Sequence, residues 1–152
     1  MKEKKQSGVQ ILILVSAVFI LAALLLSIVS SQKAYSLSHL NNVIIGCAAA
    51  IVLEVLAAVL SKSIPEALRD LMLFLAVFAD AWAMCTLVLG RTLLAGYIYF
   101  SDLEASNPVA VSAMNLAVVA IAAFLISIVL IIILLVLIVT QMIPMVSNII
   151  RD

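Results

Sequence analysis

Apolar residues fill long runs of this chain, and short polar breaks separate one run from the next. Four runs are long enough to cross a bilayer as helices, because a spanning helix needs about 20 mostly apolar residues. They cover residues 9–30, 42–61, 68–90 and 109–140. None of them alternates apolar and polar residues as a transmembrane β-strand does. The pattern predicts an all-α integral membrane protein, built as an antiparallel bundle of four transmembrane helices.

The four runs use nearly all of the 152 residues and leave no polar segment large enough for a soluble lobe. We therefore expect a single four-span membrane domain over residues 1–152. The first run follows three lysines, as in a secretory signal peptide, but it is longer than the roughly 7–15 apolar residues of such a peptide. We interpret it as a spanning helix that is not cleaved.

Helix-start and helix-stop signals mark several boundaries. Ser63 and Glu66 have the spacing of a capping box, with Pro65 between them in the first turn. Asn107 followed by Pro108 is typical of an N-cap and the first helical residue. Pro144 is expected to end or kink the fourth helix, since proline breaks the backbone hydrogen-bond ladder.

The basic residues predict the orientation, because lysine and arginine in short loops mark the cytoplasmic side. With the N-terminus inside, only Lys33 and Arg91 fall outside. The cytoplasmic side receives Lys2, Lys4, Lys5, Lys62, Arg69 and Arg151. We expect a multi-pass protein of a bacterial plasma (inner) membrane, with both termini in the cytoplasm.

Composition and charge agree with this class. Hydrophobic residues make up 67% of the chain and charged residues 11%, against about half and about a quarter in soluble domains. A soluble domain of this size buries only about 70% of its surface, too little to hide so much apolar area. Eight basic and eight acidic residues balance, so no basic face is present for nucleic acid.

The second and third runs carry small residues at helical spacing. Small residues on one face let two helix backbones approach closely inside a membrane. We expect the second and third helices to pack along these faces, and a narrow path around Glu54 is the functional alternative. The faces consist of Gly46, Ala50 and Ala57 on the second helix, and Ala76, Ala79 and Ala83 on the third.

Glu54 and Asp80 lie at membrane depth in the second and third helices, and no lysine or arginine lies at the same depth. An acid there costs a few kcal/mol, so it must face protein or water. Three interpretations are open. The two acids are protonated and hydrogen-bonded, or they pair with a basic residue of another subunit, or they bind a proton or cation in transit.

The remaining chemistry-bearing residues predict no catalytic or metal site. Cys47 and Cys85 form no C-x-x-C motif, and we expect them to be free, buried thiols. His39 is the only histidine, and with two cysteines it cannot build a usual zinc site. No phosphate-binding loop or nucleophile motif occurs. We expect no enzymatic activity, no metal and no cofactor.

The third and fourth helices carry more apolar sequence on the outer side than a bilayer of about 30 Å covers. Tilt absorbs excess length, and the aromatic residues also suit an interfacial belt. Alternatively, residues 91–111 project as a helical hairpin whose apolar patch marks a protein contact. The outer docking surface predicted in this way comprises Arg91, Leu93, Tyr97, Ile98, Phe100, Asp102 and Val109.

Two functions follow as expectations. The first is a non-catalytic accessory or assembly subunit of a larger membrane complex, which docks a partner through intramembrane and outer-face helix contacts. The alternative is a small proton- or cation-coupled transporter that uses Glu54 and Asp80. In both cases the chain contacts the lipid bilayer and either a membrane-protein partner or further copies of itself.

Overall fold

The computed structural model describes residues 2–101 and 103–151, and the side chains of residues 8–61, 63–101 and 103–140. This part contains four long helices and no strand. The predicted all-α fold with four long helices is confirmed. The elements are α1 (Lys2–Lys33), α2 (Leu40–Val59), the short 3-10 helix η1 (Leu60–Lys62), α3 (Glu66–Tyr99) and α4 (Pro108–Arg151).

All four helices are long and apolar enough to cross a membrane, which supports a multi-pass membrane protein. Large apolar side chains cover their outward faces: Leu25 is 56% exposed, Phe78 60% and Ile133 48%. Water does not favour such a surface, whereas lipid chains solvate it. The spans within the described part are Gly8–Lys33, Leu40–Val59, Glu66–Tyr99 and Pro108–Thr140.

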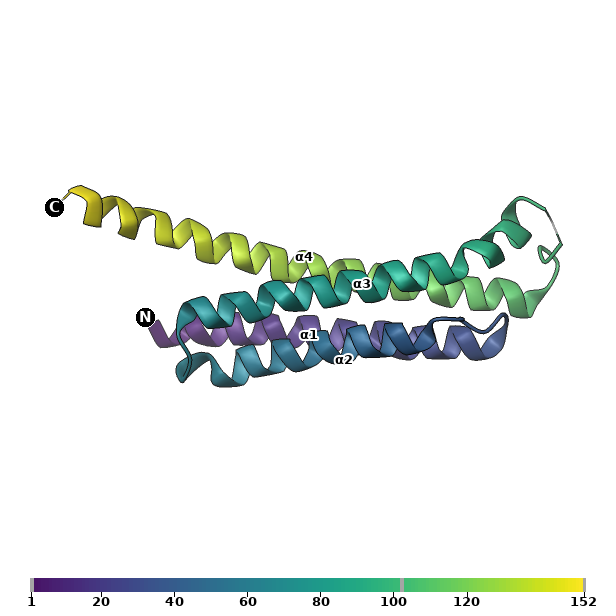
Figure 1. The fold of residues 1–152 in the computed structure, drawn as a ribbon, viewed down its shortest axis with the longest axis horizontal. Helices are drawn as coiled ribbons and strands as arrows, with labels where there is room; N and C mark the ends of the chain where they lie inside the picture. Colours follow the sequence, from purple (N-terminus) through teal and green to yellow (C-terminus); the bar gives the residue numbers. More distant parts are fainter. Residues whose placement is uncertain (1, 102, 152) are drawn as a thin grey trace.

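The chain reverses direction after each helix (Figure 1). The connections α1–α2 and α3–α4 lie at one end of the molecule, which we call the outer end after the predicted orientation. The α2–α3 connection and the beginning of α1 lie at the other end, the inner end. In cross-section α1 contacts α2 and α4, and α3 also contacts α2 and α4, so the four helices enclose a common centre.

Three apolar clusters follow one another along this centre. The outer cluster consists of Leu94, Ile98, Ala110 and Ala113. The middle cluster includes Ile20, Ala23, Val43, Cys47, Ala50, Ala83, Leu87, Ala120 and Phe124. The inner cluster consists of Ile13, Ala57, Ala58, Leu73, Ile131 and Leu134.

Helices α2 and α3 approach closely at Gly46. A Cβ atom at this position would lie 2.9 Å from the Ala83 Cβ and 3.0 Å from the Ala79 carbonyl oxygen. Ala50 and Ala76 are fully buried as well. Gly46, Ala79 and Ala83 therefore lie where the two helices meet, and Ala57 packs in the inner cluster.

Helix α3 begins later than the predicted capping box at Ser63 implies. Its first residue is Glu66, its N-cap is Pro65, and no side chain caps it. The backbone N–H of Ser63 instead donates to the Leu60 carbonyl. The predicted capping box is wrong, because proline disfavours helical geometry in the residue before it, here Ile64.

Helix α4 begins as predicted and continues further than predicted. The Asn107 Oδ1 accepts hydrogen bonds from the backbone N–H groups of Val109, at 3.0 Å, and Ala110, at 3.4 Å, and Pro108 is the first helical residue. The helix then runs through Pro144 to Arg151. Pro144 thus does not end it, since loss of one backbone hydrogen bond is tolerated within a long apolar helix.

Candidate functional site

One polar side chain from each helix meets at the middle of the bundle. These are Ser16 of α1, Glu54 of α2, Asp80 of α3 and Ser127 of α4, which we call the polar centre. Both serines are fully buried and both acids are 1% exposed. Glu54 and Asp80, which the sequence predicts at membrane depth, therefore lie in the interior of the bundle.

Helical periodicity places these residues inside. On α1 Ser16 lies between the buried residues Ile13 and Ile20, at spacings of three and four. The buried stripe of α3 includes Asp80, with Ala76 four residues before it and Ala83 three residues after it. Residues three or four apart share one helix face, so each polar residue occupies a position at which its helix faces its neighbours.

Ser16 connects three helices. Its hydroxyl donates to the Glu54 Oε1 at 3.0 Å, and its Oγ lies 2.8 Å from the Ser127 Oγ. A serine hydroxyl carries one hydrogen, so when Ser16 donates to Glu54, Ser127 donates to Ser16. In that arrangement the chain of hydrogen bonds runs from α4 through α1 to α2. The Ser16 Oγ also lies 3.4 Å from the Ser127 carbonyl oxygen.

Three carboxyl oxygens of the polar centre accept no hydrogen bond from the described residues. They are the Glu54 Oε2 and the Asp80 Oδ1 and Oδ2. The two carboxyl groups are near enough to interact electrostatically, and Ser127 lies beside Asp80. Among the described residues no basic side chain pairs with either acid. Buried carboxyl oxygens without donors are rare in proteins, so this arrangement requires a chemical explanation.

Apolar layers separate the polar centre from both ends of the bundle. On the inner side lie Ile13, Leu73 and Ile131 of the inner cluster. On the outer side lie Ile20 and Phe124 of the middle cluster. The centre is therefore a polar layer enclosed between two apolar ones.

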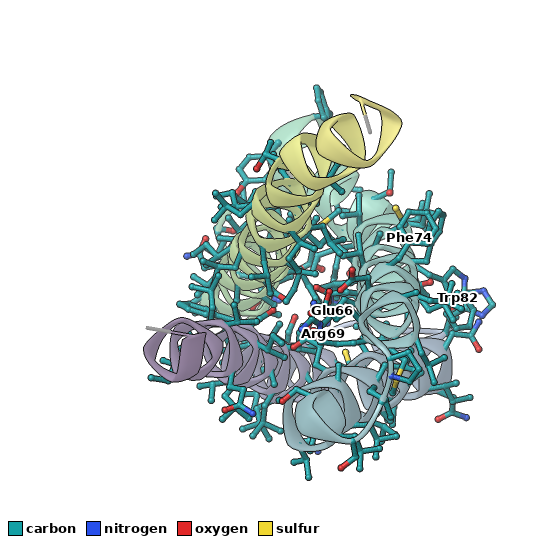
Figure 2. All side chains as sticks on the ribbon, turned by 90° about the vertical axis from the view of Figure 1, so that its left-hand side faces the viewer. Glu66, Arg69, Phe74 and Trp82 are labelled. Atoms are coloured by element: carbon teal, nitrogen blue, oxygen red, sulfur yellow. The ribbon has the colours of Figure 1, made fainter. Side chains whose placement is uncertain are left out.

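Polar residues gather at the inner end. The Gln10 Nε2 donates to the Ser61 Oγ at 2.6 Å and to the Ala58 carbonyl at 3.0 Å, which joins α1 to the end of α2. Arg69 and Asp70 form an ion pair at 3.0 Å. Figure 2 looks onto this end and shows Arg69 between the helices, whereas Phe74 and Trp82 point outward from α3.

At the outer end the buried Arg91 holds the α1–α2 connection. Its Nη1 donates to the carbonyl oxygens of Ala34, at 3.0 Å, and Tyr35, at 2.8 Å. The Tyr35 hydroxyl donates to the Glu104 Oε1 at 2.7 Å, and the Asn107 Nδ2 donates to the Glu104 Oε2 at 2.6 Å. These bonds tie the first connection of the chain to the connection between α3 and α4.

The structure divides the predicted outer docking surface. Arg91 is 1% exposed and Ile98 6%, and Ile98 packs in the outer cluster, so neither offers a free surface. Tyr97 is half-buried and its ring centroid lies 5.9 Å from that of Tyr35. The reason is that the hairpin packs against its own chain, which the apolar pattern does not reveal.

Three members of that surface remain exposed. Phe100 is 90% exposed, Leu93 73% and Val109 49%. Asp102 lies outside the described residues. Leu103, which the sequence analysis did not select, is 72% exposed.

The expectation of two free, buried thiols is met by Cys47, and the burial of Cys85 was predicted wrongly. Cys47 is buried in the middle cluster, whereas Cys85 is exposed, and both are free. Within the described part no three His, Cys, Asp or Glu side chains gather as metal ligands. Among these residues, the polar centre contains both of the buried acids.

Sequence reasoning found the two acids of the polar centre and missed its two serines. Ser16 and Ser127 each interrupt an otherwise apolar stretch, and this is the signal that could have identified them. To connect these serines with the acids, it is also necessary to know which helices face each other. Comparison of the chain with protein-family models, with curated proteins and with solved structures finds no match.

Proposed function

We propose that this chain is a small proton- or cation-coupled transporter of a bacterial plasma membrane. In this proposal the four helices span the bilayer as an antiparallel bundle, both termini are cytoplasmic, and the ion binds at the polar centre. The observation that carries the proposal is the pair of buried acids, Glu54 and Asp80, with three oxygens that accept no hydrogen bond from described residues.

The position of the two acids inside the bundle favours transport over partner docking. An acid that pairs with a basic residue of another subunit must reach the outside of the bundle. Glu54 and Asp80 are each 1% exposed, so their own chain surrounds them. Ionisable residues inside membrane segments most often mark ion pathways or proton relays, and the burial of both acids fits that role.

The apolar layers fit the role as well. An ion in the polar centre is shielded from the inner end by the inner cluster and from the outer end by the middle cluster. Such a site prevents a continuous leak, because water and ions have no open route past both layers. Transport then requires that the helices separate first on one side of the centre and then on the other.

Flux measurements on the purified full chain in liposomes test the proposal. We expect a proton or cation flux under an imposed membrane potential that is absent in empty liposomes. Glu54→Gln and Asp80→Asn should each abolish it, because both remove the ability to bind a positive charge. The control is Asp70→Asn, which removes an acid of the inner end. Absence of flux, or flux that survives both centre variants, contradicts the proposal.

A second candidate is a non-catalytic accessory subunit, and the outer end supports it. Phe100 and Leu103 are 90% and 72% exposed around the α3–α4 connection, and exposed apolar patches often mark protein contacts. The partner is then another membrane protein or a second copy of this chain. Purification from native membranes should recover a stoichiometric partner that is lost in the Phe100→Ser, Leu103→Ser double variant. Retention of every bound protein would exclude this surface.

A further inference from the structure

We propose that the polar centre binds one sodium ion, with Ser16 and Ser127 as ligands beside Glu54 and Asp80. This inference rests on the proposed function, because it names the ion that the same site takes. It adds two ligands from α1 and α4, the helices that bring no acid to the polar centre, and it assigns the hydroxyl groups a role besides hydrogen bonding.

The donor set consists of hard oxygen atoms. The three carboxyl oxygens without a hydrogen bond belong to Glu54 and Asp80, and the two hydroxyl oxygens, 2.8 Å apart, belong to Ser16 and Ser127. Hard cations prefer carboxylate, hydroxyl and carbonyl oxygens. The four helices therefore bring five candidate ligand atoms to one buried place.

A metal ion is a suitable partner for the oxygens that lack one. The Glu54 Oε2 and both Asp80 carboxyl oxygens accept no hydrogen bond from the described residues, although Ser127 lies near Asp80. A cation held between the two carboxyl groups lies next to these oxygens, and the hydroxyl oxygens of Ser16 and Ser127 have further lone pairs with which to bind it.

Charge and coordination number favour a small monovalent ion. Mg²⁺ gives up its water reluctantly and Ca²⁺ takes six to eight oxygen ligands, whereas the centre supplies five oxygens and is closed to water. K⁺ is larger and needs more oxygens to replace its hydration shell. A divalent ion would also require both acids to be ionised, which is costly in a membrane interior.

Few other charged groups face the centre. Among the described side chains, α1 and α4 bring only Ser16 and Ser127 to it, and α2 adds the buried Cys47 thiol. On α3 the nearest charged groups, Arg69 with its partner Asp70 and Arg91, lie ten or eleven residues from Asp80, about 15–17 Å along the helix. The two acids therefore supply the negative charge that the ion needs.

The test is thermal unfolding of the full-length protein in detergent, at constant ionic strength, with NaCl, KCl, CaCl₂ or choline chloride. Sodium should raise the unfolding temperature in a saturable way, and the other salts should not. Ser16→Ala and Ser127→Ala should each lower the apparent sodium affinity about tenfold, the change expected when one contact with a charged group is lost.

Two matched variants separate ligand loss from misfolding. Ser27→Ala removes a buried hydroxyl of the same helix that bonds only to the Ala23 carbonyl, and it should keep full sodium affinity. Ser16→Thr retains a hydroxyl and should keep affinity within a fewfold of the native chain, whether or not Ser16→Ala folds.

An equal or larger shift with KCl or CaCl₂, no shift with NaCl, or unchanged sodium affinity in Ser127→Ala overturns the sodium site. The proposed function fails separately. Proton flux in liposomes together with no sodium stabilisation refutes this inference and retains transport. Sodium stabilisation without any flux retains the site and refutes transport.

Discussion

The hydroxyl oxygens of Ser16 and Ser127 lie 2.8 Å apart although 111 residues separate them in the chain. Because Ser16 also bonds to Glu54, this contact joins α1, α2 and α4 at one level of the bundle. It makes the polar centre part of the packing as well as a candidate binding site.

The first prediction concerns the energy of this contact. Ser16→Ala and Ser127→Ala should each lower the free energy of unfolding by about 1 kcal/mol, as is typical of interhelical hydrogen bonds in membranes. The double variant should lose less than the sum of the two, because both single changes break the same bond. Equilibrium unfolding in mixed detergent micelles, in sodium-free buffer, measures all three losses. Strict additivity would mean that the two hydroxyls do not interact.

The second prediction concerns close packing of α2 and α3. Gly46→Ala places a Cβ atom 2.9 Å from that of Ala83 and 3.0 Å from the Ala79 backbone oxygen, so we expect it to destabilise the protein by about 1–3 kcal/mol. The matched control is Gly96→Ala, since no atom lies within 4 Å of a Cβ there. Because alanine favours helices over glycine, the control should gain up to about 1 kcal/mol. Unfolding curves that rank the two variants the other way would refute the close approach.

The third prediction distinguishes the inside of the outer hairpin from its surface. Ile98 is 6% exposed and packs in the outer cluster, so Ile98→Ala should cost about 2 kcal/mol or more. Phe100 is 90% exposed, and Phe100→Ala should change stability by less than about 0.5 kcal/mol. Thermal unfolding of the two variants beside the native chain measures both effects. Equal losses would contradict the packing described for the hairpin.

These residues also show what the sequence can and cannot predict. Apolar run length depends only on local composition, so the four helices are predictable from it. The burial of Ile98 and Arg91 depends on which helix faces which, and a single sequence does not contain that information directly. Arg91 is an extreme case, because a charge next to an apolar segment suggests the surface. Here two carbonyl oxygens of the first connection bind it instead.

The residues of the polar centre likewise fall into predictable and unpredictable ones. Glu54 and Asp80 are conspicuous because charge is rare in apolar runs, whereas a serine in a membrane helix is common. Ser16 and Ser127 become significant only when α1 and α4 are placed beside the acids. The later start of α3 has a local cause, the proline at position 65. The prediction relied on the capping-box spacing and gave this proline too little weight.

The fourth prediction is a pH dependence at the outer end. The hydrogen bond to Glu104 raises the pKa of the Tyr35 phenol above its ordinary value, with smaller contributions from desolvation and the Glu104 charge. A raised pKa means that the folded state favours the protonated phenol. The contact is therefore complete below about pH 10 and is lost as the pH rises through the raised pKa. Ultraviolet titration of the native chain against Tyr35→Phe isolates this tyrosine, and Glu104→Gln should lower its pKa toward the ordinary value. An unchanged Tyr35 titration in Glu104→Gln would refute the contact.

The last prediction asks whether the charge of Glu54 is needed for folding. Glutamine keeps an oxygen that accepts from the Ser16 hydroxyl, whereas leucine removes this acceptor and leaves Ser16 with its contacts to Ser127. We expect that the charge is not needed, so Glu54→Gln should unfold close to the native chain in sodium-free buffer. Glu54→Leu should lose about 1 kcal/mol, the net contribution of one hydrogen bond.

Adding sodium separates folding from binding in the same pair of variants. The native chain should gain stability, and Glu54→Gln should gain little, because a neutral amide cannot balance the ion's charge. If Glu54→Gln is as unstable as Glu54→Leu without sodium, the ionised carboxylate itself holds the helices together. A basic group from another chain would then have to compensate it, and the accessory-subunit proposal would gain the support that the transporter proposal loses.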